Sequence, residues 1–171
     1  MPKTRLAAQL TFIIRQGIER LESLDDEVFT RTVPGLRSGS VGAQFRHVID
    51  MITCMLRDLS SGRIDYDRRE RDWILKEIPQ RAAERMRLPA TQLEGVANRG
   101  TRSVTVKADQ LGTGVRSLDW ISSTFERELV FLLSHTVHHY ALIALMLRGI
   151  GVEVAEEFGV APSTLQYWKA G

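Results

Sequence analysis

The sequence has little cysteine, and neither positive nor negative charge is in large excess. Its 171 residues contain one cysteine, Cys54, so no disulfide can form within the chain, and a cytoplasmic location is expected. The formal net charge is only +2, and most basic residues are scattered along the chain. This balance does not favour nucleic acid as a partner.

Uninterrupted apolar stretches are also lacking. The N-terminal segment is charged and amphipathic, without the pattern of a secretory signal. The most apolar stretch, residues 129–147, is interrupted by Ser134, Thr136 and three histidines, which would be costly in lipid. We therefore expect no membrane span, and the length fits a single domain over residues 1–171.

Most of the sequence has the apolar periodicity of amphipathic helices. Apolar residues recur at steps of three and four in four segments, which predicts helices over roughly 4–24, 40–60, 79–97 and 123–148. Ser40 is the expected N-cap of the second helix. Ser122 or Ser123 is expected to cap the last helix, with Glu126 completing a capping box after Ser123. Pro79 fits the first turn of the third helix, in which Pro89 is expected to interrupt the hydrogen bonds or force a bend.

The segments between these helices indicate an all-α four-helix bundle with a small β-hairpin. Residues 25–39 have no sustained period and are expected to form a loop, and the charged stretch 64–72 is expected to be a solvated connector. Residues 103–108 alternate as in a strand and are predicted to pair with 115–120, giving a hairpin before the last helix. The tail, 150–171, is apolar enough to pack on the bundle or on a second subunit.

Three of the four histidines lie in the last predicted helix. His135 and His139 are one turn apart and about 40° apart around the helix axis, so both imidazoles can reach one cation. His47, on the second helix, could complete a site of three nitrogen ligands. His138 could replace His139, since it also lies near His135 on the helix. A separate role for each histidine as a hydrogen-bonded core residue is an equally open interpretation of the spacing.

Other polar residues near these histidines are candidates for the site. Glu128 could hydrogen-bond a ligand histidine, accept a proton from bound water, or form an ion pair with Arg127 or Arg46. Asp50 could also support a ligand histidine or be an ordinary helix charge. Cys54 is about 10 Å along the helix from His47, so it is expected to be a buried core thiol rather than a ligand.

Three motifs together resemble those of a known family. They are Ser40–Asp50, Ile64–Arg71 and the stretch from His135 to His139. On these residues the chain resembles the DinB-like (DNA-damage-inducible) superfamily of four-helix bundles. The resemblance implies a divalent metal, usually zinc or nickel, bound by His47, His135 and His139, and it favours His139 over His138.

The resemblance also implies a range of functions. The superfamily includes transferases that use low-molecular-weight thiols, so we expect a metal-dependent thiol transferase or, alternatively, a hydrolase. Glu128 and Asp50 are the candidates for supporting the metal ligands, and Arg46 for binding substrate charge. The rival expectation is a metal-stabilised stress-response or interaction module without catalysis. A homodimer is expected from the family and from the apolar tail.

Overall fold

The computed structural model is mostly helical, with one small sheet. It describes residues 2–33, 39–96, 102–107 and 120–170. The four long helices are α1 (Pro2–Glu22), α3 (Val41–Asp58), α4 (Pro79–Val96) and α5 (Phe125–Gly149). The expectation of a mainly helical fold with a small β element is therefore confirmed.

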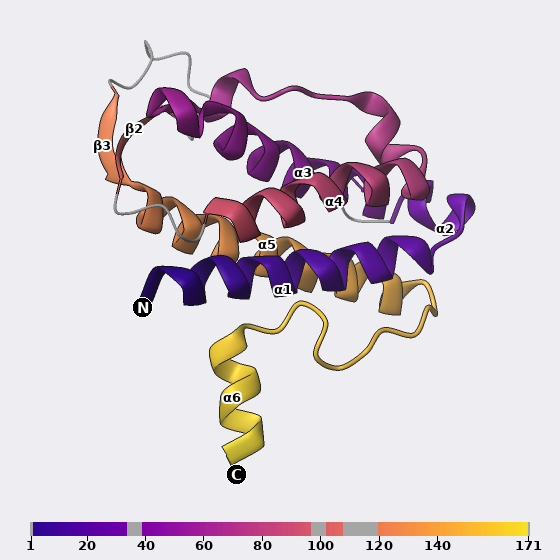
Figure 1. Cartoon of the computed structure of the whole chain (residues 1–171). Helices are drawn as coiled ribbons and strands as arrows, with labels where there is room; N and C mark the ends of the chain where they lie inside the picture. Colours follow the sequence, from indigo (N-terminus) through magenta and orange to yellow (C-terminus); the bar gives the residue numbers. More distant parts are fainter. Residues whose placement is uncertain (1, 34–38, 97–101, 108–119, 171) are drawn as a thin grey trace.

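These four helices surround one hydrophobic core. Helix α1 contacts α4 and α5, and α3 contacts the same two helices, so the contacts close a ring (Figure 1). Side chains from all four helices are buried inside it, among them Leu10, Phe45, Met86 and Tyr140. Because Tyr140 lies over Gly17, with its hydroxyl 1.8 Å from where a Cβ would stand, no larger residue fits at that position without rearrangement.

The beginning of α3 follows the prediction, and that of α5 does not. The Ser40 hydroxyl accepts a hydrogen bond of 3.1 Å from the Ala43 N–H, as an N-cap should. Helix α5 is instead capped by Thr124, which accepts from the Arg127 N–H, so the predicted cap at Ser122 or Ser123 and its capping box are wrong. The helix starts later than predicted because Ile121–Thr124 form a strand that pairs with another part of the chain.

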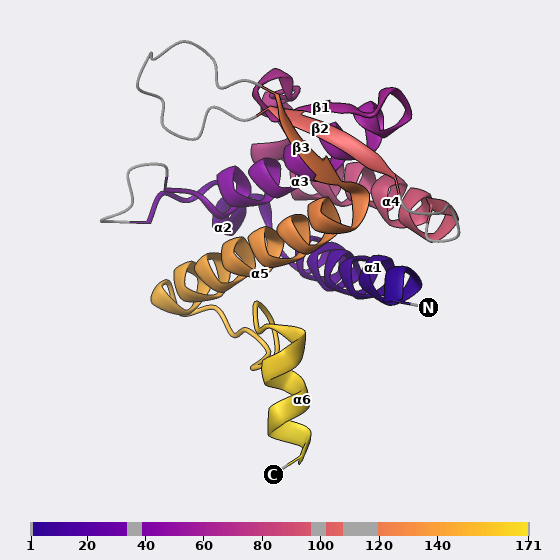
Figure 2. The ribbon, with the colours of Figure 1, turned by 90° about the vertical axis from the view of Figure 1, so that its left-hand side faces the viewer.

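The sheet differs from the predicted hairpin. Strand β2 (Ser103–Lys107) coincides with the predicted first strand, but its antiparallel partner is β3 (Ile121–Thr124). Residues 115–119 of the predicted second strand lie outside the described residues. A third strand, β1 (Arg63–Asp65), pairs with β2 in parallel, and Figure 2 shows the sheet close to the beginning of α5.

The charged stretch 64–72 is not simply a solvated connector. It includes most of β1 and the 3₁₀ turn η2 (Tyr66–Arg68), and its Ile64 and Tyr66 side chains are buried. A further 3₁₀ turn, η3 (Trp73–Lys76), follows it, and β1, η2 and η3 each contact α3. The prediction failed because the two buried side chains alternate with charged ones that face water.

The other predicted irregular segments are also partly ordered. Residues 25–39 include the short helix α2 (Asp26–Thr30), capped by Asp25 and anchored by the buried Phe29 ring, so the prediction of a plain loop was wrong there. Helix α4 continues through Pro89, which does not end it.

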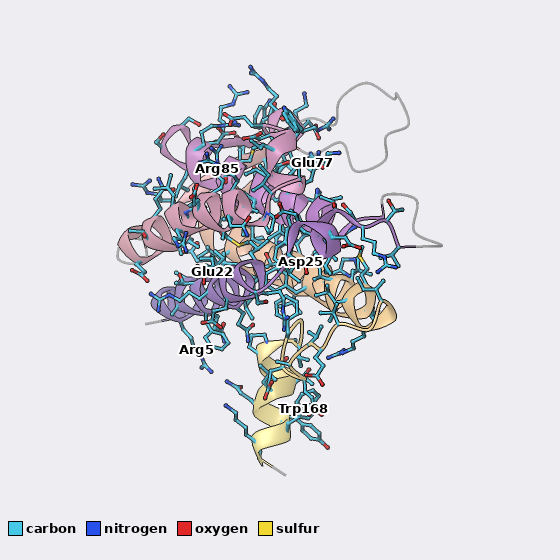
Figure 3. All side chains as sticks on the ribbon, turned by 90° about the vertical axis from the view of Figure 1, so that its right-hand side faces the viewer. Arg5, Glu22, Asp25, Glu77, Arg85 and Trp168 are labelled. Carbon is cyan, nitrogen blue, oxygen red and sulfur yellow. The ribbon has the colours of Figure 1, made fainter. Side chains whose placement is uncertain are left out.

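Part of the C-terminal tail packs on the helices. The Phe158 ring stacks on Tyr140 with centroids 4.8 Å apart, whereas α6 (Pro162–Ala170) contains no buried residue. Tyr167 and Trp168 on α6 are 79% and 53% exposed, and Figure 3 shows Trp168 well away from the other helices. Phe158 therefore packs on its own chain, whereas for Tyr167 and Trp168 the alternative of packing on a second subunit stays a prediction.

Candidate metal centre

Three histidines from two helices converge between α3 and α5. One potential ligand atom from each of His47, His135 and His139 lies within 4.8 Å of the other two, and all three residues are half-buried. The Nε2 atoms of His47 and His135 are 2.9 Å apart, a hydrogen-bond distance at which one ring donates to the other. Helices α3 and α5 thus bring together the residues that the sequence predicted.

The third histidine is oriented by a residue that sequence reasoning missed. His139 Nδ1 is 2.7 Å from the side-chain oxygen of Gln44. Because an amide oxygen only accepts, Nδ1–H is the donor, and the lone pair of Nε2 is available to bind a metal. Gln44 precedes His47 by three residues on α3, and this spacing places both on one face of the helix. That spacing was the signal that could have identified it.

The surroundings keep the imidazoles neutral. Burial, then the positive charges of His135 and Arg69, lower the pKa of His47 to about 4. Burial, then His135 and His47, lower the pKa of His139 to about 3, and the pKa of His135 is also lowered, mainly by burial. Metal ions bind neutral imidazole, so near pH 7 no proton has to be displaced from these rings.

The nitrogen atoms of His47 and His135 are close to the spacing that a transition metal requires. Two nitrogen ligands about 2.05 Å from a tetrahedral ion stand about 3.3 Å apart. Since the His47 and His135 nitrogen atoms are 2.9 Å apart, an ion would replace their hydrogen bond and separate them by a few tenths of an ångström. Three imidazoles would hold such an ion and leave positions open for other ligands.

His138 lies outside this cluster. It is exposed, and its ring contacts His139 with centroids 5.3 Å apart. Among the described residues, the cluster contains His139 instead. Of the alternatives that the helix spacing left open, the geometry therefore favours the pair formed by His135 and His139.

Glu128 belongs to a separate buried network beside the histidines. Its two carboxylate oxygens accept hydrogen bonds of 2.8 Å from the Tyr66 hydroxyl and 2.6 Å from the Ser123 hydroxyl. Among the described residues it forms no ion pair within 4.0 Å, and its hydrogen bonds go to Tyr66 and Ser123 rather than to a histidine. Of the three roles left open for Glu128, the ion pair with Arg127 or Arg46 and the hydrogen bond to a ligand histidine are therefore not found. The Tyr66 ring contacts Phe131, which stacks on His135, and these contacts connect the network to the histidine cluster.

Asp50 and Arg46 face each other on α3. Arg46 Nε lies 3.9 Å from Asp50 Oδ2, and the carboxylate is 7% exposed. Burial raises the pKa of Asp50 to about 7 despite the opposing effect of Arg46. Asp50 therefore faces Arg46 rather than a histidine. The residue that hydrogen-bonds a histidine of the cluster is Gln44, not Asp50 as the sequence suggested.

Cys54 is the buried core thiol that the sequence predicted. Its sulfur lies 3.1 Å from the Asp65 carbonyl oxygen, and the residue is 1% exposed. Burial and the nearby Asp58 carboxylate raise the pKa of the thiol to about 12. The thiolate form is therefore negligible near neutral pH, and the thiol is unreactive.

Comparisons with known proteins leave the family open. No family model matches the chain, and no solved structure matches it. A stretch of 47 residues is 47% identical to FK506-binding protein 5 of Rhizopus delemar. This stretch is 28% of the chain and covers 12% of the length of that protein, so the likeness is local.

Proposed function

We propose that the chain is a DinB-like four-helix bundle that uses a divalent metal, zinc or nickel, held by His47, His135 and His139. The observation that carries the proposal is the convergence of three neutral imidazoles from two helices within 4.8 Å. The ring of contacts among α1, α3, α4 and α5 supports the bundle assignment. The bond from His139 to Gln44 supports a ligand role, because metal-binding histidines commonly donate their second nitrogen in this way.

The proposed activity is thiol transfer to an electrophile, with hydrolysis as the alternative reaction. A divalent ion at such a site lowers the pKa of a bound thiol or water, so that a nucleophile forms near neutral pH. The protein's own contribution is to hold the ring of His139 through Gln44 and to place the Phe131 ring against His135. The exposed part of each histidine leaves the centre accessible to a small molecule.

Metal analysis of the purified full-length protein tests this proposal. We expect about one equivalent of zinc or nickel in the wild type and a loss of most of it in His135→Ala. His138→Ala is the matched control, because His138 is on the same helix but outside the cluster, and it should keep the metal. A wild-type protein that binds neither ion after reconstitution would rule out the proposal.

A second candidate is a metal-stabilised interaction module without catalysis. Its supporting observation is α6, which exposes Tyr167 and Trp168 and buries no residue. Cobalt substitution distinguishes the two candidates, because a catalytic centre has an open position where an added thiol changes the cobalt spectrum. An unchanged spectrum with several thiols would favour the interaction module.

The proposal includes a homodimer in the cytoplasm, with a small molecule rather than nucleic acid or membrane as the further partner. By length and composition α5 could cross a membrane, but a soluble protein's core helix passes the same test. We favour a core helix because α5 contacts α1 and α3 and buries Tyr140 and Ile143. Light scattering after size-exclusion chromatography tests the dimer.

A further inference from the structure

A cavity of about 510 Å³ lies where the end of α3 meets the sheet. It is lined by Arg57 and Asp58 of α3, Arg63 and Asp65 of β1, Arg68 of η2, and Trp120 just before β3. Sites for small organic molecules commonly have volumes of roughly 300–1,000 Å³. The cavity is therefore large enough for an organic molecule and not only for an ion. None of its lining residues belongs to the histidine cluster.

One acidic residue of the cavity is already paired. The Arg57 guanidinium donates to both carboxylate oxygens of Asp58, at 2.7 Å from Nε and 3.1 Å from Nη2. Asp58 also accepts a hydrogen bond of 3.2 Å from the Asp65 N–H. A carboxylate held in such a two-point contact has its charge compensated by that one arginine. Asp58 therefore does not neutralise the other two arginines of the cavity.

The other two arginines, Arg63 and Arg68, give the cavity its positive charge. Within the described part of the chain, neither forms an ion pair within 4.0 Å. The second acidic residue, Asp65, accepts a hydrogen bond of 3.1 Å from the Asp67 N–H. The Arg63 guanidinium carbon lies 4.3 Å from the centre of the Trp120 ring, a cation–π contact that orients the guanidinium but does not neutralise it. Three guanidinium groups against two carboxylates leave the lining with an excess of positive charge.

The arrangement of these guanidinium groups favours phosphate over carboxylate. A guanidinium binds the oxygens of either anion through paired N–H donors. A carboxylate has two oxygens in one plane, whereas a phosphate monoester has three acceptor oxygens that point in different directions. A phosphate can therefore accept hydrogen bonds from arginines on two separate elements, here Arg63 on β1 and Arg68 on η2.

The Trp120 ring adds a flat apolar surface for the rest of such a ligand. We propose that the cavity binds the phosphate monoester of a small organic molecule, with Arg63 and Arg68 as the donors to the phosphate. This binding site lies outside the histidine cluster, so the inference does not depend on the proposed metal.

Isothermal titration calorimetry of the full-length protein tests the inference. The probes are phenyl phosphate and benzoate, which have the same ring and differ in the anionic group. We compare the wild type with Arg63→Met and Arg68→Met, each of which removes one guanidinium from an exposed position. Arg71→Met is the matched control, because Arg71 is an exposed residue of the same connector between α3 and α4 but does not line the cavity. His135→Ala separates this site from the histidine cluster.

We expect phenyl phosphate to bind the wild type and benzoate to bind several times more weakly. The dissociation constant of phenyl phosphate should rise about tenfold in Arg63→Met and in Arg68→Met, because each variant loses charged hydrogen bonds to the phosphate. Arg71→Met and His135→Ala should stay within about twofold of the wild type. Both arginines of the site are exposed, so their variants should remain folded.

The opposite results would overturn the inference. It fails if the wild type does not bind phenyl phosphate, or if benzoate binds as tightly. It also fails if either Arg63→Met or Arg68→Met binds as tightly as the wild type, or if Arg71→Met weakens binding equally. Loss of binding in His135→Ala would place the phosphate at the histidine cluster instead of the cavity. A wild type that binds neither zinc nor nickel would contradict the proposed function but not this inference.

Discussion

The Tyr66 hydroxyl donates a hydrogen bond of 2.8 Å to Glu128, and both residues are buried. This bond joins the connector to α5 across 62 positions of sequence. Tyr66→Phe would leave one buried carboxylate oxygen without its donor, and we expect the free energy of unfolding to fall by about 1–3 kcal/mol. Urea denaturation measures the change. Tyr167→Phe, at a residue 79% exposed, should match the wild type, and equal stability of the two variants would contradict this account.

Gln44→Ala should weaken metal binding without removing a ligand. The His139 ring would lose the acceptor that orients it, and the loss of such a partner typically costs about tenfold or more in affinity. Competition with a chromophoric zinc chelator gives the dissociation constant. Gln92→Ala, at an exposed position of α4, is the control. Unchanged affinity in Gln44→Ala would show that the hydrogen bond plays no part in binding.

Metal removal should destabilise the wild-type protein. An ion that binds only the folded state at about 100 times its dissociation constant adds about 2.7 kcal/mol to stability, which corresponds to about 5–10 °C in Tm. We therefore expect EDTA to lower the Tm of the zinc-loaded wild type by that amount, measured by calorimetry. His135→Ala should melt at the same temperature with and without EDTA. A wild-type Tm insensitive to EDTA would argue against a bound ion.

Asp50→Asn should alter the dependence of stability on pH. The pKa of Asp50 is raised to about 7 by burial, from 3.8, so the folded state holds a proton that the unfolded state releases. The resulting stabilisation is complete below about pH 4 and is lost as the pH rises through about 7. The asparagine variant cannot ionise, so its stability relative to the wild type should increase by about 1–3 kcal/mol between pH 4 and pH 8.

Denaturation of both proteins at several pH values measures this difference. Asp26→Asn, on the exposed surface of α2, serves as the control for the loss of one carboxylate. A constant difference between Asp50→Asn and the wild type across the range would contradict the raised pKa.

Gly159→Ala should release the part of the tail that packs on α5. Gly159 has a φ of 79°, and a Cβ there would lie 2.5 Å from the backbone nitrogen of Ala141. We expect a loss of about 2 kcal/mol or more, because the change combines backbone strain with a backbone clash next to the Phe158 ring. Gly149→Ala is the control, since a Cβ there meets nothing within 4 Å. Equal stability of the two variants would exclude this close approach.

Much of the helical framework could be predicted from the sequence. The four long helices were located to within a few residues at most ends, because apolar periodicity and the Ser40 cap are local signals. The proximity of His135 and His139 could also be predicted, because residues four positions apart lie one turn apart on the same side of a helix. The end of β3 and the start of α5 were misjudged because the three residues before the helix, Ser122 to Thr124, pair with β2.

Tertiary structure decided which distant residues meet. His47 and His135 are 88 positions apart, and the bond from Gln44 to His139 spans 95, so no local spacing specifies either contact. The parallel pairing of β1 with β2 likewise joins segments separated by all of α4. The sequence alone determined the helices and the residue types able to bind a metal. Only the packing of α3 on α5, driven by burial of their apolar faces, placed His47 beside His135 and Gln44 beside His139.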